Sequence, residues 1–155
     1  MLQITVIMVG KTRMKFIQNG LDFYQKRLAP YLNLKLVSVR EEKEGNLPPD
    51  LIRGREAERL RAQIPPRGWV AALDPFGKEH TSEEFAAWLV KREEEARPLT
   101  FLIGGHLGLD PKIFLWAHDR LALSKLTLTH ELSRLVLLEQ LYRAMTIKTG
   151  HPYHV

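Results

Sequence analysis

Short apolar runs recur along the chain, and a longer segment separates each run from the next. An apolar run of about four to eight residues, rich in Ile, Val and Leu, is typical of a strand buried in a sheet. The four clearest runs are Leu2–Val9, Leu34–Val39, Trp69–Leu73 and Leu99–Ile103. A fifth run, Leu121–Leu128, is also short and apolar, although polar residues are interleaved in it.

The segments between these runs have apolar residues at helical spacing and residues typical of helix ends. Asp, Ser and Thr favour the position before a helix, Pro is tolerated at its first position, and Pro further on stops it. The five predicted helices are Met14–Leu28, Asp50–Ile64, a segment that begins at Thr81 or Ser82, one opened by Asp110 and Pro111, and His130 to about Thr146.

Strands therefore alternate with helices from one end of the chain to the other. This order predicts an α/β fold with a mostly parallel sheet and helices on both of its faces. In an open sheet of this kind, ligands bind outside the carboxyl ends of the strands. The residues that follow the strands are therefore the candidates for a site: Gly10, Leu73–Gly77, Gly104–Gly108 and Leu123–Leu128.

The composition narrows the class of protein. A chain of 155 residues is long enough for one ordinary domain, and we expect a single domain over residues 1–155. The absence of cysteine excludes disulfides, thiolate metal sites and a cysteine nucleophile. The apolar start has no basic flank, and no apolar run approaches the ~20 residues of a membrane span, so we expect a cytoplasmic protein without a membrane partner.

Positive charge is concentrated at the two ends of the chain. The formal net charge is +5. Residues 1–40 hold seven basic and one acidic group, residues 41–111 hold ten and fourteen, and residues 112–155 hold six and three. If the fold brings the ends together, they form a basic face suited to a nucleic acid. The alternative is that the charges only keep the protein soluble, and composition alone leaves both interpretations open.

Familiar nucleotide-binding motifs are incomplete. Gly10-Lys11-Thr12 resembles the end of a phosphate-binding P-loop, but Thr5 occupies the position of the required first glycine. The run Ile103–Gly108 lacks the first glycine of the dinucleotide fingerprint and follows the fourth strand rather than the first. What remains is a glycine-rich turn between strand and helix, either a turn without a ligand or a place where a flat ligand can approach the backbone.

Metal sites are also disfavoured by the pattern of histidines. His130-Glu131 begins like a zinc-protease helix but has no second histidine, and His151 and His154 alone supply too few ligands. The tail from His151 to His154 is rich in aromatic rings, which can stack on a base, although a chain end more often frays. We therefore expect no metal.

The segment from His130 is apolar almost all round, which is typical of a helix buried in the protein or against a partner subunit. Glu139 and Arg143 lie four residues apart on this helix. They form either an ordinary surface ion pair, worth only ~0.2–0.5 kcal/mol, or charged groups that line a site or a dimer seam.

Several segments, taken in order, resemble one family. They are Leu73-Asp74 with Gly77-Lys78, Ile103-Gly104-Gly105 with Gly108, Leu123–Leu128 with His130, Arg134 with Leu138-Glu139 and Leu141–Ala144, and the ending Gly150-His151-Pro152-Tyr153-His154. The whole chain resembles the small SPOUT-class ribosomal RNA methyltransferases of the RlmH type. That family methylates N3 of a pseudouridine in 23S rRNA of the large ribosomal subunit. The resemblance implies a deep C-terminal trefoil knot, a homodimer and S-adenosylmethionine (AdoMet) as methyl donor.

The resemblance also implies which residues bind the donor. It assigns AdoMet to Leu73, to Gly104 and to one loop. The loop residues are Leu123, Ser124, Lys125, Leu126, Thr127 and Leu128. These positions coincide with the strand ends selected above without the family.

Methyl transfer requires a base that is aligned with the donor and loses its N3 proton. The candidate catalytic residues are Arg143, Tyr153 and His154. Our hypothesis is that Tyr153 and His154 reach the site from the partner's tail, while Arg143 orients the base or its phosphate. The candidate contacts to rRNA phosphates are Lys11, Arg13 and Lys15. The rRNA substrate is either in the free large subunit or in the whole ribosome. The alternatives are a nucleotide-binding or flavin-binding module and a non-catalytic rRNA-binding assembly factor.

Overall fold

A computed structural model describes all residues from Met1 to Val155 and contains one five-stranded sheet. The strands are β1 (Gln3–Val9), β2 (Asn33–Val39), β3 (Trp69–Glu79), β4 (Leu99–Ile103) and β5 (Asp119–Ala122). They lie in the order β2-β1-β4-β3-β5, and every neighbouring pair is parallel. The predicted α/β fold is confirmed.

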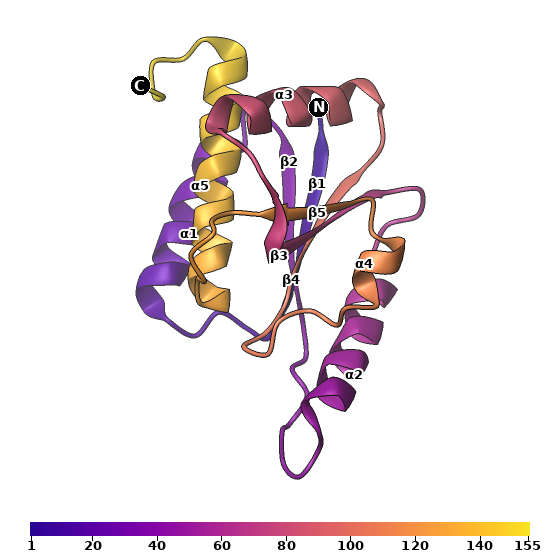
Figure 1. Cartoon of the computed structure of the whole chain (residues 1–155). Helices are drawn as coiled ribbons and strands as arrows, with labels where there is room; N and C mark the ends of the chain where they lie inside the picture. Colours follow the sequence, from indigo (N-terminus) through magenta and orange to yellow (C-terminus); the bar gives the residue numbers. More distant parts are fainter.

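Five helices cover the two faces of the sheet (Figure 1). They are α1 (Lys15–Leu28), α2 (Pro49–Ala62), α3 (Ser82–Glu94), α4 (Ile113–Trp116) and α5 (His130–Thr149). The buried side chains of α1, α3 and α5 pack on one face in a core of 22 residues, and those of α2 and α4 pack on the other in a core of nine. The larger core lies where α5 packs between α1 and α3, as expected for a helix that is apolar almost all round.

Local sequence signals explain how two of the helices begin and pack. Thr81, rather than Ser82, caps α3: its hydroxyl accepts a hydrogen bond from the Glu84 N–H, and the Glu84 carboxylate accepts one from the Thr81 N–H. Gly20 lies inside α1 where α5 is closest, and a Cβ there would be 2.6 Å from the side chain of Leu135. The glycine therefore allows close contact between the two helices.

Two strand boundaries differ from those predicted. β3 does not end at Leu73 but continues to Glu79, because Leu73 and Lys78 both pair with Leu121 and residues 74–77 bulge out of the ladder. β5 ends at Ala122, and residues 123–129 form a loop instead of the second half of a strand. An edge strand with a single neighbour gains few hydrogen bonds from further extension.

The C-terminal part of the chain follows a long path. From β5 it passes beside the loops that follow β3 and β4, and then returns to the other side of the sheet as α5 (Figure 1). This course is consistent with the trefoil knot that the resemblance implies. No helix combines the length and the apolar composition that a membrane span requires.

Candidate functional site

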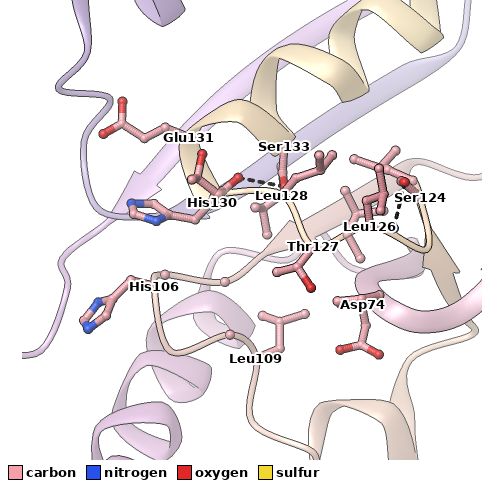
Figure 2. A pocket seen from close by; sticks show the side chains of 18 of the residues that line it. Asp74, His106, Leu109, Ser124, Leu126, Thr127, Leu128, His130, Glu131 and Ser133 are labelled. Carbon is pink, nitrogen blue, oxygen red and sulfur yellow. Dashed lines mark hydrogen bonds between the residues drawn. The ribbon is translucent and has the colours of Figure 1, made fainter.

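A cavity of about 600 Å³ opens at the carboxyl ends of the strands. Three segments surround it: residues 73–75 where the β3 bulge begins, residues 104–109 after β4 and residues 123–129 after β5. The first turns of α5 close one side (Figure 2). Its size lies within the ~300–1,000 Å³ range of small-molecule sites. The cavity therefore forms where the parallel sheet predicts a ligand.

Seven of the eight predicted donor-binding residues line this cavity. They are Leu73, Gly104, Leu123, Ser124, Leu126, Thr127 and Leu128. Lys125 is in the same loop, but its side chain is 85% exposed and lies 3.6 Å from Glu79, outside the cavity.

The glycines after β4 bring main chain to the cavity wall. The Gly108 N–H donates a hydrogen bond of 2.9 Å to the Gly105 carbonyl, and Gly108 has a φ of 79°, so the loop turns back tightly on itself. A Cβ on Gly104 would lie 2.6 Å from the carbonyl carbon of Gly108 and 2.8 Å from the nitrogen of Leu109. Only a residue without a side chain fits at Gly104.

The loop after β5 leaves its main chain available to a ligand. Between Ser124 and Leu128, the only main-chain group bonded within the chain is the Leu126 N–H, which donates to the Ser124 hydroxyl at 2.9 Å. Lys125, Leu126 and Thr127 are exposed, so the main-chain groups of this loop are accessible from the cavity and from solvent. An apolar slot beside unpaired N–H and C=O groups is suited to a flat heterocycle with a polar edge, such as an adenine.

Hydrogen bonds from the loop after β1 hold the first turns of α5 at one side of the cavity. The Glu131 carboxylate accepts hydrogen bonds of 3.0 Å from the N–H groups of Arg13 and Met14. Arg134 is completely buried and donates to the Thr12 hydroxyl at 2.8 Å and to the Val9 carbonyl at 2.7 Å. These contacts tie the loop after β1 to the first turns of α5 and place Met14 in the cavity wall.

Two titratable groups of the cavity wall, Glu131 and His130, have shifted pKa values. Burial raises the pKa of Glu131, but the N–H groups of Met14 and Arg13 and the charge of Arg134 outweigh it, so the net pKa lies below the ordinary value. Burial, with the charge of Arg134, lowers the pKa of His130, which therefore favours the neutral ring. His106, on the glycine loop, is exposed and pairs with Glu44.

Sequence reasoning missed several residues of the cavity wall. Leu109, His130, Glu131 and Ser133 line it, together with Met14. The available signal was the position of the α5 start, directly after the loop of residues 123–129, because the first turn of that helix must then lie beside the same cavity.

The three candidate catalytic residues come together in a second place. Arg143 Nη1 lies 3.1 Å from His154 Nδ1, and its guanidinium carbon lies 4.8 Å from the centre of the Tyr153 ring. Glu139 joins them, because it pairs with Arg143 and accepts a hydrogen bond from the Tyr153 hydroxyl at 3.0 Å. The Glu139–Arg143 pair is thus not an isolated surface pair, since about four fifths of each side chain is buried.

This second cluster does not border the cavity of its own chain. Ser133 is the residue of α5 furthest along the helix that lines the cavity, and Arg143 lies ten residues beyond it, which corresponds to ~15 Å at 1.5 Å per residue. None of Arg143, Tyr153 and His154 lines the cavity.

Comparison with known proteins identifies the family. A family model described as "Predicted SPOUT methyltransferase" matches residues 2–154. A ribosomal RNA large subunit methyltransferase H from Gemmatimonas aurantiaca is 42% identical over 153 residues, and the alignment covers 99% of each chain. The protein of the same name from Anaeromyxobacter dehalogenans is 43% identical with the same coverage.

The similarity to a solved structure is weaker than the similarity to these sequences. The AdoMet complex of the SpoU methyltransferase AviRb from Streptomyces viridochromogenes is 15% identical, with a TM-score of 0.46 over 96% of this chain and 58% of the other. At that level it assigns no residue of the present cavity. The full-length matches decide the family: the chain belongs to the SPOUT methyltransferases, among the proteins named ribosomal RNA large subunit methyltransferase H.

Proposed function

We propose that this protein acts in the cytoplasm as an AdoMet-dependent methyltransferase on N3 of a pseudouridine in large-subunit rRNA, and that it works as a homodimer. The observation that carries the proposal is the cavity at the strand ends, with its apolar lining and its unpaired main-chain groups, in a chain of this family. The family names support an rRNA substrate, and the pseudouridine N3 comes from the resemblance in the sequence.

The residues of the cavity suit AdoMet. The leucines at 73, 123, 126 and 128 offer the adenine an apolar slot, and the main chain of the loop from Ser124 to Leu128 offers partners for its edge. Gly104 lets the ligand approach the backbone closely. When bound, AdoMet supplies a methyl group on a sulfonium, and the protein's task is to align the base with it.

A dimer explains the distance between the two clusters. A base held near Arg143, Tyr153 and His154 is ~15 Å along α5 from the cavity of the same chain, too far for a methyl transfer. A two-fold axis that pairs α5 with an antiparallel copy brings the tail of one subunit to the cavity of the other. The complete site is then shared between two chains.

The outer face of α1 and α5 supports such a pairing. Met14 and Phe16 are 47% and 59% exposed, and they lie next to the start of α5, where Met14 donates its N–H to Glu131. On α5 itself, Val136 is only half-buried and packs against neither of the two cores. Exposed apolar side chains of this size favour a contact with another protein surface, here a second copy of the chain.

A truncated protein that ends at Gly150 tests the role of the tail. We expect it to bind AdoMet with the affinity of the full chain in calorimetry and to transfer no tritiated methyl to ribosomes or to free rRNA. Retention of the full methylation rate would refute the assignment of Tyr153 and His154. ATP, NAD and FMN serve as control ligands, and preferred binding of any of them would refute the donor assignment.

Mixed dimers test whether the site is shared. A truncated chain with an intact cavity is co-expressed with a full-length chain whose cavity is blocked by Gly104→Ala, and the two are separated by different tags. At an AdoMet concentration that saturates the wild type but not Gly104→Ala, we expect each homodimer to have little activity. A shared site predicts that the mixed dimer regains methylation, because one chain contributes the cavity and the other the tail. If the tail works on its own chain, the mixed dimer stays inactive.

A further inference from the structure

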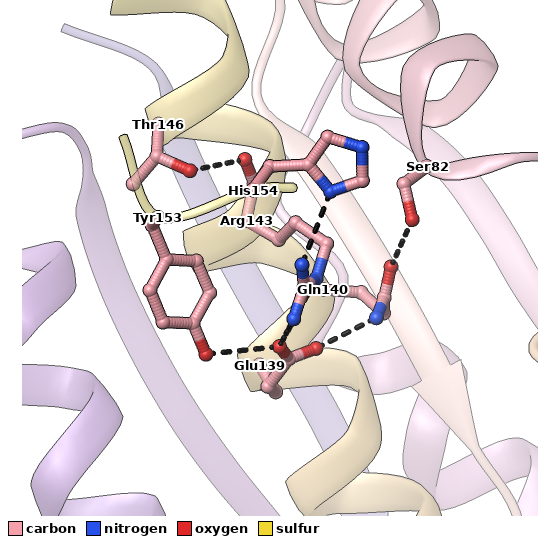
Figure 3. Close-up of polar contacts among 7 residues, drawn as sticks. All are labelled: Ser82, Glu139, Gln140, Arg143, Thr146, Tyr153 and His154. Atoms are coloured by element: carbon pink, nitrogen blue, oxygen red, sulfur yellow. Dashed lines mark hydrogen bonds and ion pairs between the residues drawn. The ribbon is translucent and has the colours of Figure 1, made fainter. Parts of the chain in front are cut away.

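One carboxylate lies at the centre of the second cluster. Glu139 Oε1 accepts hydrogen bonds from Arg143 Nε at 3.1 Å, from Arg143 Nη2 at 2.6 Å and from the Tyr153 hydroxyl at 3.0 Å (Figure 3). Its other oxygen accepts one from Gln140 Nε2 at 2.6 Å. A single side chain therefore fixes two of the three groups that the proposed function assigns to the substrate.

The tail reaches Glu139 through a specific turn. Gly150 has a φ of 75° and ends α5, and the N–H groups of Gly150 and His151 donate to the carbonyls of Ile147 and Thr146. The chain then runs back along the helix, and Tyr153 meets Tyr142 edge to face at 4.7 Å. This return brings the Tyr153 hydroxyl to a carboxylate fourteen residues earlier in the sequence.

The cluster is also tied to the start of α3. Gln140, bonded to Glu139, accepts a hydrogen bond of 3.2 Å from the Ser82 hydroxyl. His154 Nε2 lies 2.8 Å from the Glu83 carboxylate. Gln140, which contacts Glu139, and His154, which contacts Arg143, are thus both held by the start of α3.

We propose that Glu139 is a positioning residue for methyl transfer, which holds Arg143 and Tyr153 in one fixed arrangement and makes the phenol oxygen of Tyr153 a hydrogen-bond acceptor toward the substrate base. This inference rests on the proposed function of Arg143 and Tyr153. Because the Tyr153 hydroxyl donates its proton to Glu139, its oxygen can take part in a further hydrogen bond only as an acceptor. A base that offers N–H groups, as pseudouridine does on two ring nitrogens, is the complementary partner.

The acidity of Tyr153 agrees with this role. Burial, the neighbouring Tyr24 phenol and the hydrogen bond and charge of Glu139 together raise the pKa of Tyr153 far above its ordinary value. The phenol therefore stays protonated at neutral pH. Glu139 also raises the pKa of Arg143, so the guanidinium keeps its charge next to the base.

Two substitutions at Glu139 test the inference. Glu139→Gln keeps the length of the side chain and removes its charge, and Glu139→Asp keeps the charge and withdraws it by one methylene. We expect both to lower kcat about 10- to 100-fold, with KM for ribosomes, AdoMet affinity and thermal stability close to those of the wild type. Glu93→Gln is the matched control, because Glu93 pairs with Lys148 between α3 and α5 but contacts neither Arg143 nor Tyr153.

An optical measurement follows the phenol without any methyl transfer. The ultraviolet absorbance of phenolate, taken as the difference between each protein and its Tyr153→Phe variant, reports ionisation of Tyr153 alone. Loss of the Glu139 charge predicts that phenolate forms at lower pH in Glu139→Gln than in the protein with Glu139 intact. An unchanged titration would overturn the inference.

The outcomes separate the inference from the function on which it rests. If Arg143→Lys and Tyr153→Phe lose activity and Glu139→Gln keeps it, the positioning role is wrong and the proposed function stands. If Arg143→Lys and Tyr153→Phe both remain fully active, the proposed function of these residues fails, and the inference fails with it. A Glu139→Gln variant that loses stability and AdoMet affinity in proportion to activity would show a structural role only.

Discussion

Gly104→Ala is the smallest change that should close the proposed donor cavity. The added methyl group would lie 2.6 Å from the carbonyl carbon of Gly108 and 2.8 Å from its oxygen. Ordinary contacts begin at 3.4 Å, so the main chain at Gly108 would have to retreat by 0.8 Å. Both residues belong to the cavity wall, and neither has a flexible side chain that could move instead.

The expected magnitude follows from that displacement. Forcing a methyl group into packed backbone costs about 1–3 kcal/mol of folding stability, and each kcal/mol lowers the melting temperature of a chain of this size by about 2–4 °C. A cavity wall displaced by almost 1 Å should weaken AdoMet binding about 10- to 100-fold, which corresponds to about 1.4–2.8 kcal/mol. Calorimetry with AdoMet and a thermal melt measure the two effects separately.

Gly54→Ala is the control for the same change of one methyl group. Gly54 lies inside α2, where the new Cβ first meets Asp110 Oδ2 at an ordinary 3.4 Å. In a helix this substitution stabilises by roughly 0.5–1 kcal/mol, and donor binding should not change. If Gly104→Ala binds AdoMet like the wild type and melts no lower than the control, the glycine loop does not form the wall of the donor site.

The remaining predictions concern pH and charge. The folded-state pKa of Glu131 lies below the ordinary value, so its contribution to stability is complete above that ordinary value and is lost as the pH falls through the lowered one. Glu131→Gln should therefore lose less melting temperature than the wild type between about pH 7 and about pH 3, and an equal loss would contradict the assigned hydrogen bonds. Reversing Lys11 and Lys15, which are exposed and make no ion pair, should weaken rRNA binding and flatten its logarithmic salt dependence by roughly one for each phosphate contact removed. Arg13 is the less informative choice because it pairs with Glu41, and an unchanged slope for the two lysines would remove them from the interface.

Most of the fold was predictable because its signals are local. An apolar run or a helical repeat depends on neighbours within one or two turns, and all ten elements appear in the predicted order. The residues at which β3 and β5 end were not predictable. The bulge at residues 74–77 arises because β3 pairs with Leu121, more than forty residues away. Such pairing leaves no periodic trace in either segment.

The candidate site, like the fold, was predictable from the sequence only in part. The sequence predicted that residues after the strands share a ligand site, because the carboxyl ends of parallel strands meet at one edge. Leu73, Gly104 and residues of the loop from Leu123 to Leu128 do line one cavity, and their role in binding a donor stays a prediction. The burial of Arg134 against Val9 and the return of Tyr153 to Glu139 are visible only in three dimensions. These contacts join residues far apart along the chain or across the Gly150 turn, and their energy depends on packing in three dimensions, which no local pattern encodes.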